Sequence, residues 1–465
     1  MTAFRHLLAG AFISLTLSTQ AVAQPARPSY QPIRYEEDWS RLCDRSLHED
    51  PFDPVKCVPL ARANWFLTVA GETRERYERV DYPAFGFGPS DTNGYLLQRF
   101  LFSTDWHTGT RARVFVELQS GLTHGRNGVP IPSLTDKLDL HQGFMDLVPL
   151  KRTRHEIRIR AGRQELAFGT GRLVSAAEGL NVRRSFDGVR VIGRHADWTW
   201  NAGLYQLVKP ATGVFDDAAD RNLTHWGAGA IGRHTLWAGA GFSLYYFGVE
   251  RKDAMFTGAT ARSLRHTVGS RSWRSGGAPW DFNHEAVVQW GSFGNRRISA
   301  WGVSTDTGFT FSDRLRTRVG IRADLTSGDA RLGDGALNSF DPLFPSAISY
   351  SGNSGLLGPT NLLDVGPTIR VSPSRRMTVM VGAPVFWRQS LADGVYLITT
   401  VPVPQSSRSE ARFVGVNPDV SLAWQIDRHL QVTALFSHFF VGPFLGETTP
   451  GRAVNYGYTA LLYRF

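Results

Sequence analysis

Arginine supplies most of the chemistry that this sequence could perform. Of its 51 cationic side chains only five are lysines, and the formal net charge is +10. The clearest pattern lies in residues 314–324, where charged and apolar residues alternate. The charged set is Arg314, Arg316, Arg318, Arg322 and Asp324. Guanidinium groups bind carboxylates through a planar pair of donors, so such a row predicts selection of anionic solutes.

Other predicted strands place charged residues on one face in the same way. The further candidate pore-lining residues from this pattern are Arg99, Arg113, Glu117, Arg158 and Arg160. An alternative interpretation is that carboxylates on neighbouring strands neutralise the arginines, which then only brace the wall. Because residues 314–324 offer only Asp324 against four arginines, those carboxylates would have to come from elsewhere.

Enzyme signatures are absent from the sequence. It has no G-x-S-x-G or H-E-x-x-H motif, and its thirteen histidines do not cluster at metal-ligand spacing. Residues 227–232 (GAGAIG) match a dinucleotide fingerprint, but no helical pattern follows, as that motif requires. We therefore expect no catalytic residues, no cofactor and no bound metal.

The N-terminus has the features of a secretory signal peptide over residues 1–23. Arg5 precedes an apolar run at residues 7–17, and Ala21-Val22-Ala23 forms a small-residue cleavage site. Export argues against a nucleic-acid partner. It also favours a possible disulfide between Cys43 and Cys57, because the periplasm is oxidising. We expect residues 24–62 to form a periplasmic N-terminal extension and residues 63–465 to form one domain.

That domain is predicted to be an all-β, closed, antiparallel barrel in the bacterial outer membrane. From Trp65 onward the sequence has a period of two, and no later run approaches the ~18 apolar residues of a membrane-spanning helix. At the end of the chain Leu461, Tyr463 and Phe465 share one face. This resembles the terminal strand signature by which the barrel assembly machinery recognises its substrates.

Seventeen segments have the expected alternation, and barrels of this kind close with an even number of strands. The apolar residues 394–401 could supply one more, so we predict eighteen strands, with sixteen as the alternative. Residues 106–110, 192–198 and 427–429 are predicted to be tight turns, and residues 251–280, 328–360 and 442–453 long extracellular loops. The predicted strands are 64–79, 95–106, 111–120, 138–148, 155–164, 185–194, 197–208, 225–233, 236–250, 281–290, 296–309, 314–327, 361–371, 377–388, 411–426, 430–441 and 454–465.

Several sequence blocks resemble the alginate export family. They are residues 76–81 (RYERVD), 138–142 (LDLHQ), 161–169 (AGRQELAFG), 181–190 (NVRRSFDGVR), 341–345 (DPLFP) and 357–362 (LGPTNL). The resemblance implies a monomeric eighteen-stranded barrel whose arginine-lined constriction passes a uronate polymer outward. It also implies a gating loop and periplasmic secretion proteins that feed the pore. The residues at matching motif positions are Arg163, Arg183, Arg184, Asp187 and Arg190.

The sequence thus predicts an outer-membrane channel embedded in lipid. The leading hypothesis is passive export of an anionic polysaccharide, and the polymeric cargo follows from the resemblance alone. One alternative is an anion-selective uptake porin for small acidic solutes. A second alternative is a structural or adhesive barrel that does not conduct.

Overall fold

The two-residue periodicity of the sequence sets which side chains face outward from the sheet. In strand β14 (Arg318–Thr326), Val319 and Ile321 are 47% and 50% exposed, whereas Arg318 and Asp324 are 7% and 1% exposed. Successive side chains of a strand point to opposite faces, so the apolar set lies outside and the charged set inside. This inside-out arrangement is that of a barrel surrounded by lipid. Outward apolar residues of other strands include Phe102, Val114, Val189, Leu204, Val288, Ile369 and Phe436.

The computed structural model describes residues 28–465, apart from residues 63, 89–90, 234–239, 257–258, 276–277, 332, 347–349, 351, 353 and 399. The predicted signal peptide at residues 1–23 lies outside the described residues. Among these residues, no helix combines the length and apolar character needed to span a membrane.

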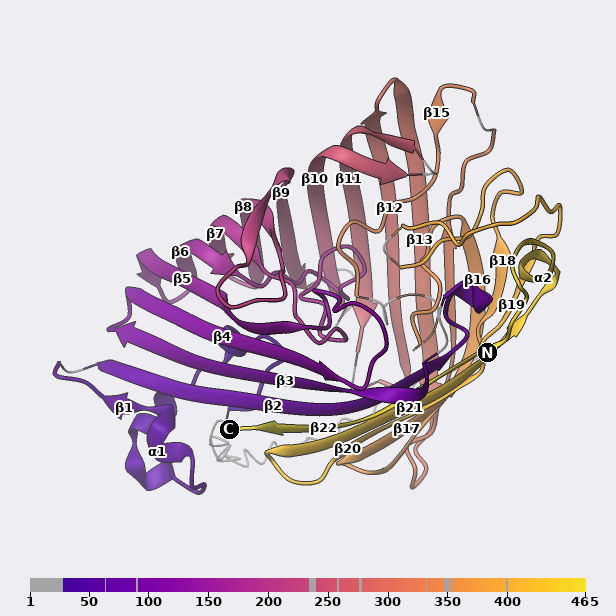
Figure 1. The fold of residues 1–465 in the computed structure, drawn as a ribbon. Helices are drawn as coiled ribbons and strands as arrows, with labels where there is room; N and C mark the ends of the chain where they lie inside the picture. The colour runs from indigo at the N-terminus through magenta and orange to yellow at the C-terminus, as the bar shows by residue number, and fades with distance from the viewer. Residues whose placement is uncertain are drawn as a thin grey trace, which may run out of the picture.

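The described strands form one antiparallel wall (Figure 1). They are β2 (Trp65–Asp81), β3 (Asp91–Thr108), β4 (Ala112–His124), β5 (Asp136–Arg152), β6 (His155–Gln164), β7 (Phe186–His195), β8 (Trp198–Lys209), β9 (Ala218–Arg233), β10 (Gly241–Phe256), β11 (Ala259–Arg274), β12 (Trp280–Phe293), β13 (Arg296–Thr310), β14, β16 (Leu362–Ser374), β17 (Met377–Gly382), β18 (Val385–Arg388), β19 (Phe413–Val416), β20 (Asp419–Gln425), β21 (Leu430–Val441) and β22 (Val454–Arg464). The short strands β1 (Val58–Pro59) and β15 (Ala336–Leu337) add to its edges.

Pairing of β2 with both β3 and β22 closes the wall into a barrel. β17 and β18 together occupy one wall position, interrupted at Pro384, and β19 and β20 occupy the next, interrupted at Pro418. Proline lacks an N–H for the ladder, which explains both interruptions. In the part of the chain that the structure describes, eighteen wall positions result, and the predicted strand number is confirmed.

The identity of the eighteenth strand was predicted wrongly. It is β11, which lies within residues 251–280, the segment expected to be a loop. Residues 394–401 belong instead to the connection between β18 and β19, where Val395 and Tyr396 are 1% exposed. Their apolar character therefore reflects packing inside the barrel, not a position in its wall.

The two ends of the barrel differ in the length of their connections. At one end, here called the short-turn end, the turns include residues 109–111, 153–154 and 196–197. At the other, the long-loop end, residues 327–361 and 442–453 form long connections, as predicted. The second of these contains helix α2 (Pro443–Thr448). In Figure 1, α2 and the N-terminal helix α1 (Asp53–Lys56) lie at opposite ends of the wall.

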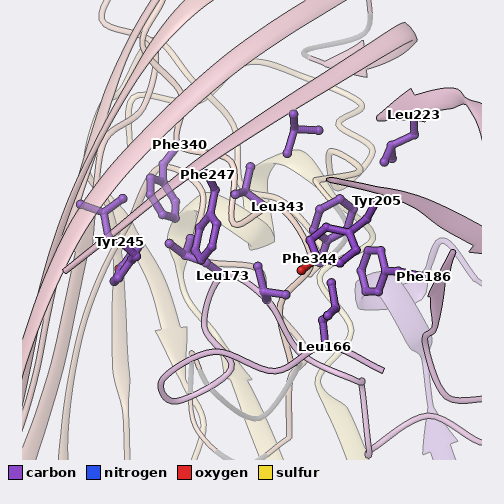
Figure 2. Close-up of a cluster of buried hydrophobic side chains, with 13 residues drawn as sticks. Leu166, Leu173, Phe186, Tyr205, Leu223, Tyr245, Phe247, Phe340, Leu343 and Phe344 are labelled. Atoms are coloured by element: carbon purple, nitrogen blue, oxygen red, sulfur yellow. The ribbon is translucent and has the colours of Figure 1, made fainter. Parts of the chain in front are cut away.

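Two connections from the long-loop end fold into the barrel. Residues 165–185 contribute Leu166 and Leu173 to an apolar cluster, and residues 327–361 contribute Phe344 (Figure 2). This cluster packs against inward-facing aromatic residues of the wall, which are Phe186, Tyr205, Tyr245 and Phe247. The lumen is thus filled on this side by folded chain.

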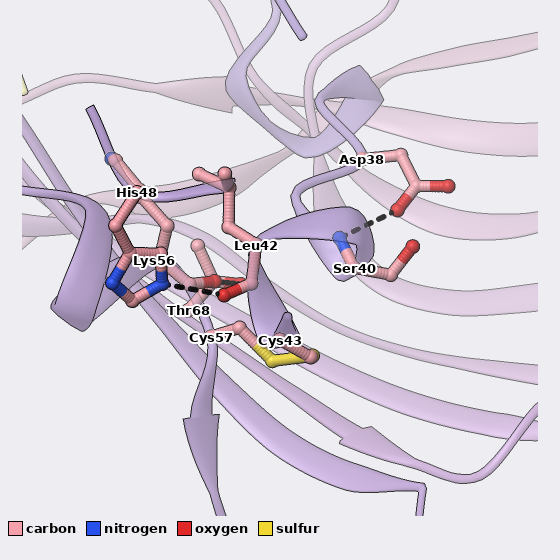
Figure 3. The surroundings of a disulfide bond; sticks show 8 residues. All are labelled: Asp38, Ser40, Leu42, Cys43, His48, Lys56, Cys57 and Thr68. Carbon is pink, nitrogen blue, oxygen red and sulfur yellow. Dashed lines mark hydrogen bonds between the residues drawn. A yellow bond between two sulfur atoms is a disulfide. The ribbon is translucent and has the colours of Figure 1, made fainter. Parts of the chain in front are cut away.

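Residues 28–62 form an N-terminal segment at the short-turn end. It contains three short 3-10 helices (Arg34–Glu36, Ser40–Cys43 and Arg45–Leu47), followed by α1 and β1. A disulfide joins Cys43 to Cys57 (Figure 3), and Thr68 of β2 donates a hydrogen bond to the Lys56 carbonyl at 2.7 Å. The disulfide therefore cross-links the segment internally, and the hydrogen bond attaches it to the first wall strand.

Candidate functional site

The predicted arginine row is shorter in the structure than in the sequence. β14 begins at Arg318, so Arg314 and Arg316 lie in the preceding turn, outside the strand. Asp313 causes this, because its carboxylate accepts hydrogen bonds from the backbone N–H and hydroxyl of Thr317 at 2.7 and 2.6 Å. Such a local side-chain turn competes with strand pairing. The strand boundary predicted at residue 314 was therefore wrong.

The remaining charged residues of β14 meet carboxylates from other strands. Arg318 lies 2.6 Å from Asp281 of β12 and 2.7 Å from Asp306 of β13. Asp324 is 3.1 Å from Arg172 of the inward loop and 3.6 Å from Arg322. The acids that this strand lacks in its own sequence are thus supplied from elsewhere in the barrel.

A cavity of about 550 Å³ lies inside the barrel beside β14. Its charged lining residues are Arg316, Arg318, Arg322, Arg370, Asp281, Asp306, Asp364 and Asp419. Arg316 and Arg370 are exposed, and among the described residues neither has an ion-pair partner. Arg318 already holds both Asp281 and Asp306, so Arg316 and Arg370 are the exposed lining arginines that a dissolved anion could reach without displacing an ion-pair partner.

The arginines near β2, β3 and residues 165–185 form a buried network. Arg99 lies 2.6 Å from both Glu72 and Glu178. Arg183 lies 2.5 Å from Glu165 and also contacts Glu178. The Arg99–Glu178 pair connects the inward loop to the wall, whereas the pairs of Arg183 lie within the loop, so Arg99 and Arg183 brace the structure.

A second network holds the N-terminal segment. Arg113 pairs with Asp105 at 2.6 Å and donates a hydrogen bond to the Tyr35 carbonyl at 2.8 Å. Arg160 pairs with Asp146 at 2.7 Å, and its guanidinium lies 4.1 Å from the centre of the Tyr35 ring. Arg158 joins the same network at 3.7 Å from Asp146 and 2.8 Å from Glu156.

Three of the residues at the family motif positions, Arg163, Asp187 and Arg184, lie outside these two networks. Arg163 and Asp187 pair at 2.8 Å, and Asp187 shares a face of β7 with the outward Val189, so this pair lies on the outer side of the wall. Arg184 donates hydrogen bonds to the carbonyls of Ser175 and Phe344 at 3.1 and 2.7 Å.

Arg190 and Glu117 both face the interior without reaching the large cavity. Arg190 lines a small void of about 20 Å³ with Tyr205 and His225. Glu117 is 1% exposed and accepts a hydrogen bond from Gln142 at 2.8 Å. The predicted site residues therefore do not converge on one path. Those that line the large cavity are Arg316, Arg318 and Arg322.

Sequence reasoning missed several residues of the interior. Arg370, Asp281 and Asp306 lie in predicted strands, at the charged positions of an alternating pattern. A search for acids at those positions would have found the partners of Arg318. Arg172 gave no such signal, because it lies in a loop whose inward course depends on tertiary packing.

The residues of the predicted assembly signal complete the barrel. Leu461 is 49% exposed on the outer face of β22, and Tyr463 shares that face. Phe465 exchanges two backbone hydrogen bonds of 3.0 Å with Gly71 of β2. The chain's last residue thus helps to close the wall.

Comparison with known proteins supports this architecture. The alginate export family model matches residues 66–458, whereas a search of curated protein sequences found no match. *Pseudomonas aeruginosa* OpdK, crystallised with vanillate, has a TM-score of 0.56 at 12% identity over 86% of this chain and 98% of its own. A BenF-like porin from *Pseudomonas fluorescens* Pf-5 has a TM-score of 0.57 at 10% identity, over 86% and 99%. *Pseudomonas aeruginosa* OccD3 (OpdP) has a TM-score of 0.57 at 11% identity, over 88% and 93%.

At these identities the solved structures establish a porin-like fold, and the family model extends over most of the wall. The chain is therefore an outer-membrane channel that belongs to the alginate export family.

Proposed function

We propose that this channel exports an anionic polysaccharide passively, with Arg316 and Arg370 as the residues that attract it. The supporting observation is the pair of exposed arginines beside the 550 Å³ cavity, next to acids that Arg318 already holds. Exposed guanidinium groups without an ion-pair partner attract anions to the cavity. Membership of the alginate export family favours a uronate-like polymer as the cargo.

This proposal also assigns the two ends of the barrel. Short turns face the periplasm and long loops face outward in barrels of this kind. Arg316 lies in a turn of the short-turn end, so a polymer leaving the periplasm would meet it early. Export in this direction needs no energy source within the channel, because the polymer diffuses down its own gradient.

Bilayer conductance with the double variant Arg316→Ala/Arg370→Ala tests the role of these residues. We expect the anion-to-cation permeability ratio to fall by about tenfold at low ionic strength, where screening is weak. Arg111→Ala is the matched control, because Arg111 is an exposed arginine in another short turn and does not line the cavity. An unchanged ratio in the double variant, or an equal fall in the control, would contradict the proposal.

A second candidate function is uptake of small acidic solutes. The cavity volume of about 550 Å³ supports it, since pockets for small molecules span ~300–1,000 Å³. OpdK, one of the similar solved structures, was crystallised with the small carboxylate vanillate. Block of the current by oligouronates but not by small organic acids would favour export, and the reverse would favour uptake. A barrel without any conductance would exclude both.

A further inference from the structure

Three carboxylates meet at the long-loop end, away from the large cavity. Asp136 and Asp139 belong to β5, and Asp217 ends the loop between β8 and β9. One oxygen atom of each lies within 4.8 Å of those of the other two. Asp136 and Asp139 are 0% and 3% exposed. Burial of so much negative charge is unfavourable unless a partner compensates it or a carboxylate takes up a proton.

Asp136 lacks such a partner among the described residues. Neither of its carboxylate oxygens, both shielded from solvent, accepts a hydrogen bond there. Its neighbours differ in this respect, because Asp139 accepts hydrogen bonds from the backbone N–H groups of Asp216 and Asp217 at 2.8 and 3.1 Å. Asp217 accepts one from Ala211 at 2.6 Å. The unsatisfied oxygens therefore belong to the most buried member of the cluster.

The arginine beside the cluster does not balance its charge. Arg163 approaches Asp139 only to 3.9 Å, and its Nε and Nη2 atoms donate to Asp187 at 2.8 and 3.2 Å. One guanidinium group is thus shared between Asp139 and Asp187. Asp136 and Asp217 are left with a net negative charge that a bound cation would neutralise.

We propose that Asp136, Asp139 and Asp217 bind a calcium ion. All three offer hard oxygen donors, and Ca²⁺ accepts several carboxylates together with carbonyls and water in flexible geometry. The absence of histidine and cysteine from this cluster disfavours zinc. Our expectation of no metal came from histidine spacing, which could not reveal acids that are up to about eighty positions apart in the sequence.

The ion would fasten the loop at residues 210–217 to β5. This loop already contacts the start of β5, where the N–H of Lys137 donates to the Gly213 carbonyl at 3.1 Å and that of Phe215 to the Leu138 carbonyl at 2.9 Å. The intervening β6 and β7 have only 10 residues each, against 17 in β5. The loop therefore passes over the ends of these two shorter strands to reach β5. The ion would hold the loop in this position independently of the solute that the channel carries.

Calorimetric titration of calcium chloride into the folded, full-length, EDTA-treated barrel tests this proposal. We expect saturable binding that Asp136→Asn weakens by at least about 100-fold. Mutation of residues that only hydrogen-bond to metal ligands already lowers metal affinity by about 10–100-fold, and Asp136 would be a ligand itself. Asp253→Asn is the matched control, because Asp253 is an exposed acid on β10 outside the cluster. Its calcium affinity should equal that of the unmodified protein.

A loop variant and a proteolysis assay cover the case in which Asp136→Asn does not fold. Asp217→Asn changes only the loop, and it should weaken calcium binding similarly. Calcium should slow chymotrypsin cleavage after Phe215, whose side chain is 60% exposed, and Asp217→Asn should abolish this protection. No calcium binding by the unmodified protein, an affinity of Asp136→Asn or Asp217→Asn equal to that of the unmodified protein, or equal affinity for magnesium would overturn the proposal.

Discussion

The ammonium group of Lys56 lies among aromatic rings at the short-turn end. Its Nζ atom is 5.0 Å from the ring centre of Trp39, 5.5 Å from that of Tyr30 and 5.8 Å from that of Phe465. Burial lowers the pKa of Lys56 to about 7, and the nearby Arg34 adds to the shift. We therefore expect this one residue to couple attachment of the N-terminal segment to pH.

We predict that attachment of this segment strengthens as the pH rises from about 7 towards 10.5. In that range the detached lysine holds a proton that the buried one has lost, so the attached state gains stability with pH. The gain is complete above the ordinary pKa of 10.5 and absent below about 7. Hydrogen exchange of residues 28–62, corrected for intrinsic rates, measures this. Lys56→Met should remove the pH dependence, and an equal dependence in that variant would exclude Lys56 as its cause.

At the scale of elements, ion pairs help to hold residues 165–185 in the lumen. Arg183 holds Glu165 and Glu178 within this loop and donates a hydrogen bond to the Pro32 carbonyl of the N-terminal segment at 2.7 Å. Both Arg183 and Glu165 have side chains that are 1% exposed. Loss of one member of such a buried pair leaves an uncompensated charge.

Arg183→Met should therefore destabilise the inward position of this loop by about 3–5 kcal/mol. We expect single-channel recordings to show a higher mean conductance and more frequent fluctuations. Arg158→Met is the comparison, because the Arg158 side chain is 32% exposed and such pairs contribute about 1 kcal/mol or less. Identical recordings from both variants would mean that the loop is held by its apolar cluster and not by Arg183.

Strands could be predicted from the sequence where their outward side chains are apolar, as in β14. The prediction failed for β11, where some outward side chains are polar. β14 has Val319, Ile321 and Leu325 outside, which makes the alternation plain. The outward positions of β11 include the polar Ser270 and Ser272, so its period is weak. Residues 394–401 show the converse error, since an apolar run also forms when a loop packs inside the lumen.

At the scale of the whole molecule, the barrel could be predicted because the sequence patterns that indicate its strands are local. The ion pairs inside the barrel could not be predicted, because they join residues that are far apart in the sequence. Strand alternation and the terminal Phe465 are visible in short stretches of sequence. Arg318 and Asp281 are 37 positions apart, and Arg99 and Glu178 are 79. Which arginines remain available to a solute depends on such pairs, and these form only after the strands take their register and the loops turn inward.

Deletion of Phe465 should impair assembly of the barrel while leaving its conductance, once assembled, unchanged. The deletion removes the two hydrogen bonds to Gly71 that help to close the wall, and it removes the terminal aromatic residue. The amount of heat-modifiable, folded barrel in outer-membrane fractions measures this effect. Phe440→Ala is a suitable control, since Phe440 is an outward aromatic residue of β21 that is 55% exposed. Normal membrane levels of the deletion variant would refute a role for Phe465 in assembly.

Contacts between the two ends of the described chain predict an order of assembly. Phe52 stacks on Phe465 with ring centres 5.0 Å apart, and Arg34 donates a hydrogen bond to the Phe465 carbonyl at 3.0 Å. If the barrel assembly machinery recognises Phe465, as the sequence predicts, the N-terminal segment cannot contact Phe465 during that recognition. We therefore expect residues 28–62 to take their final position only after this recognition, so that the finished barrel covers the residue that directed its assembly.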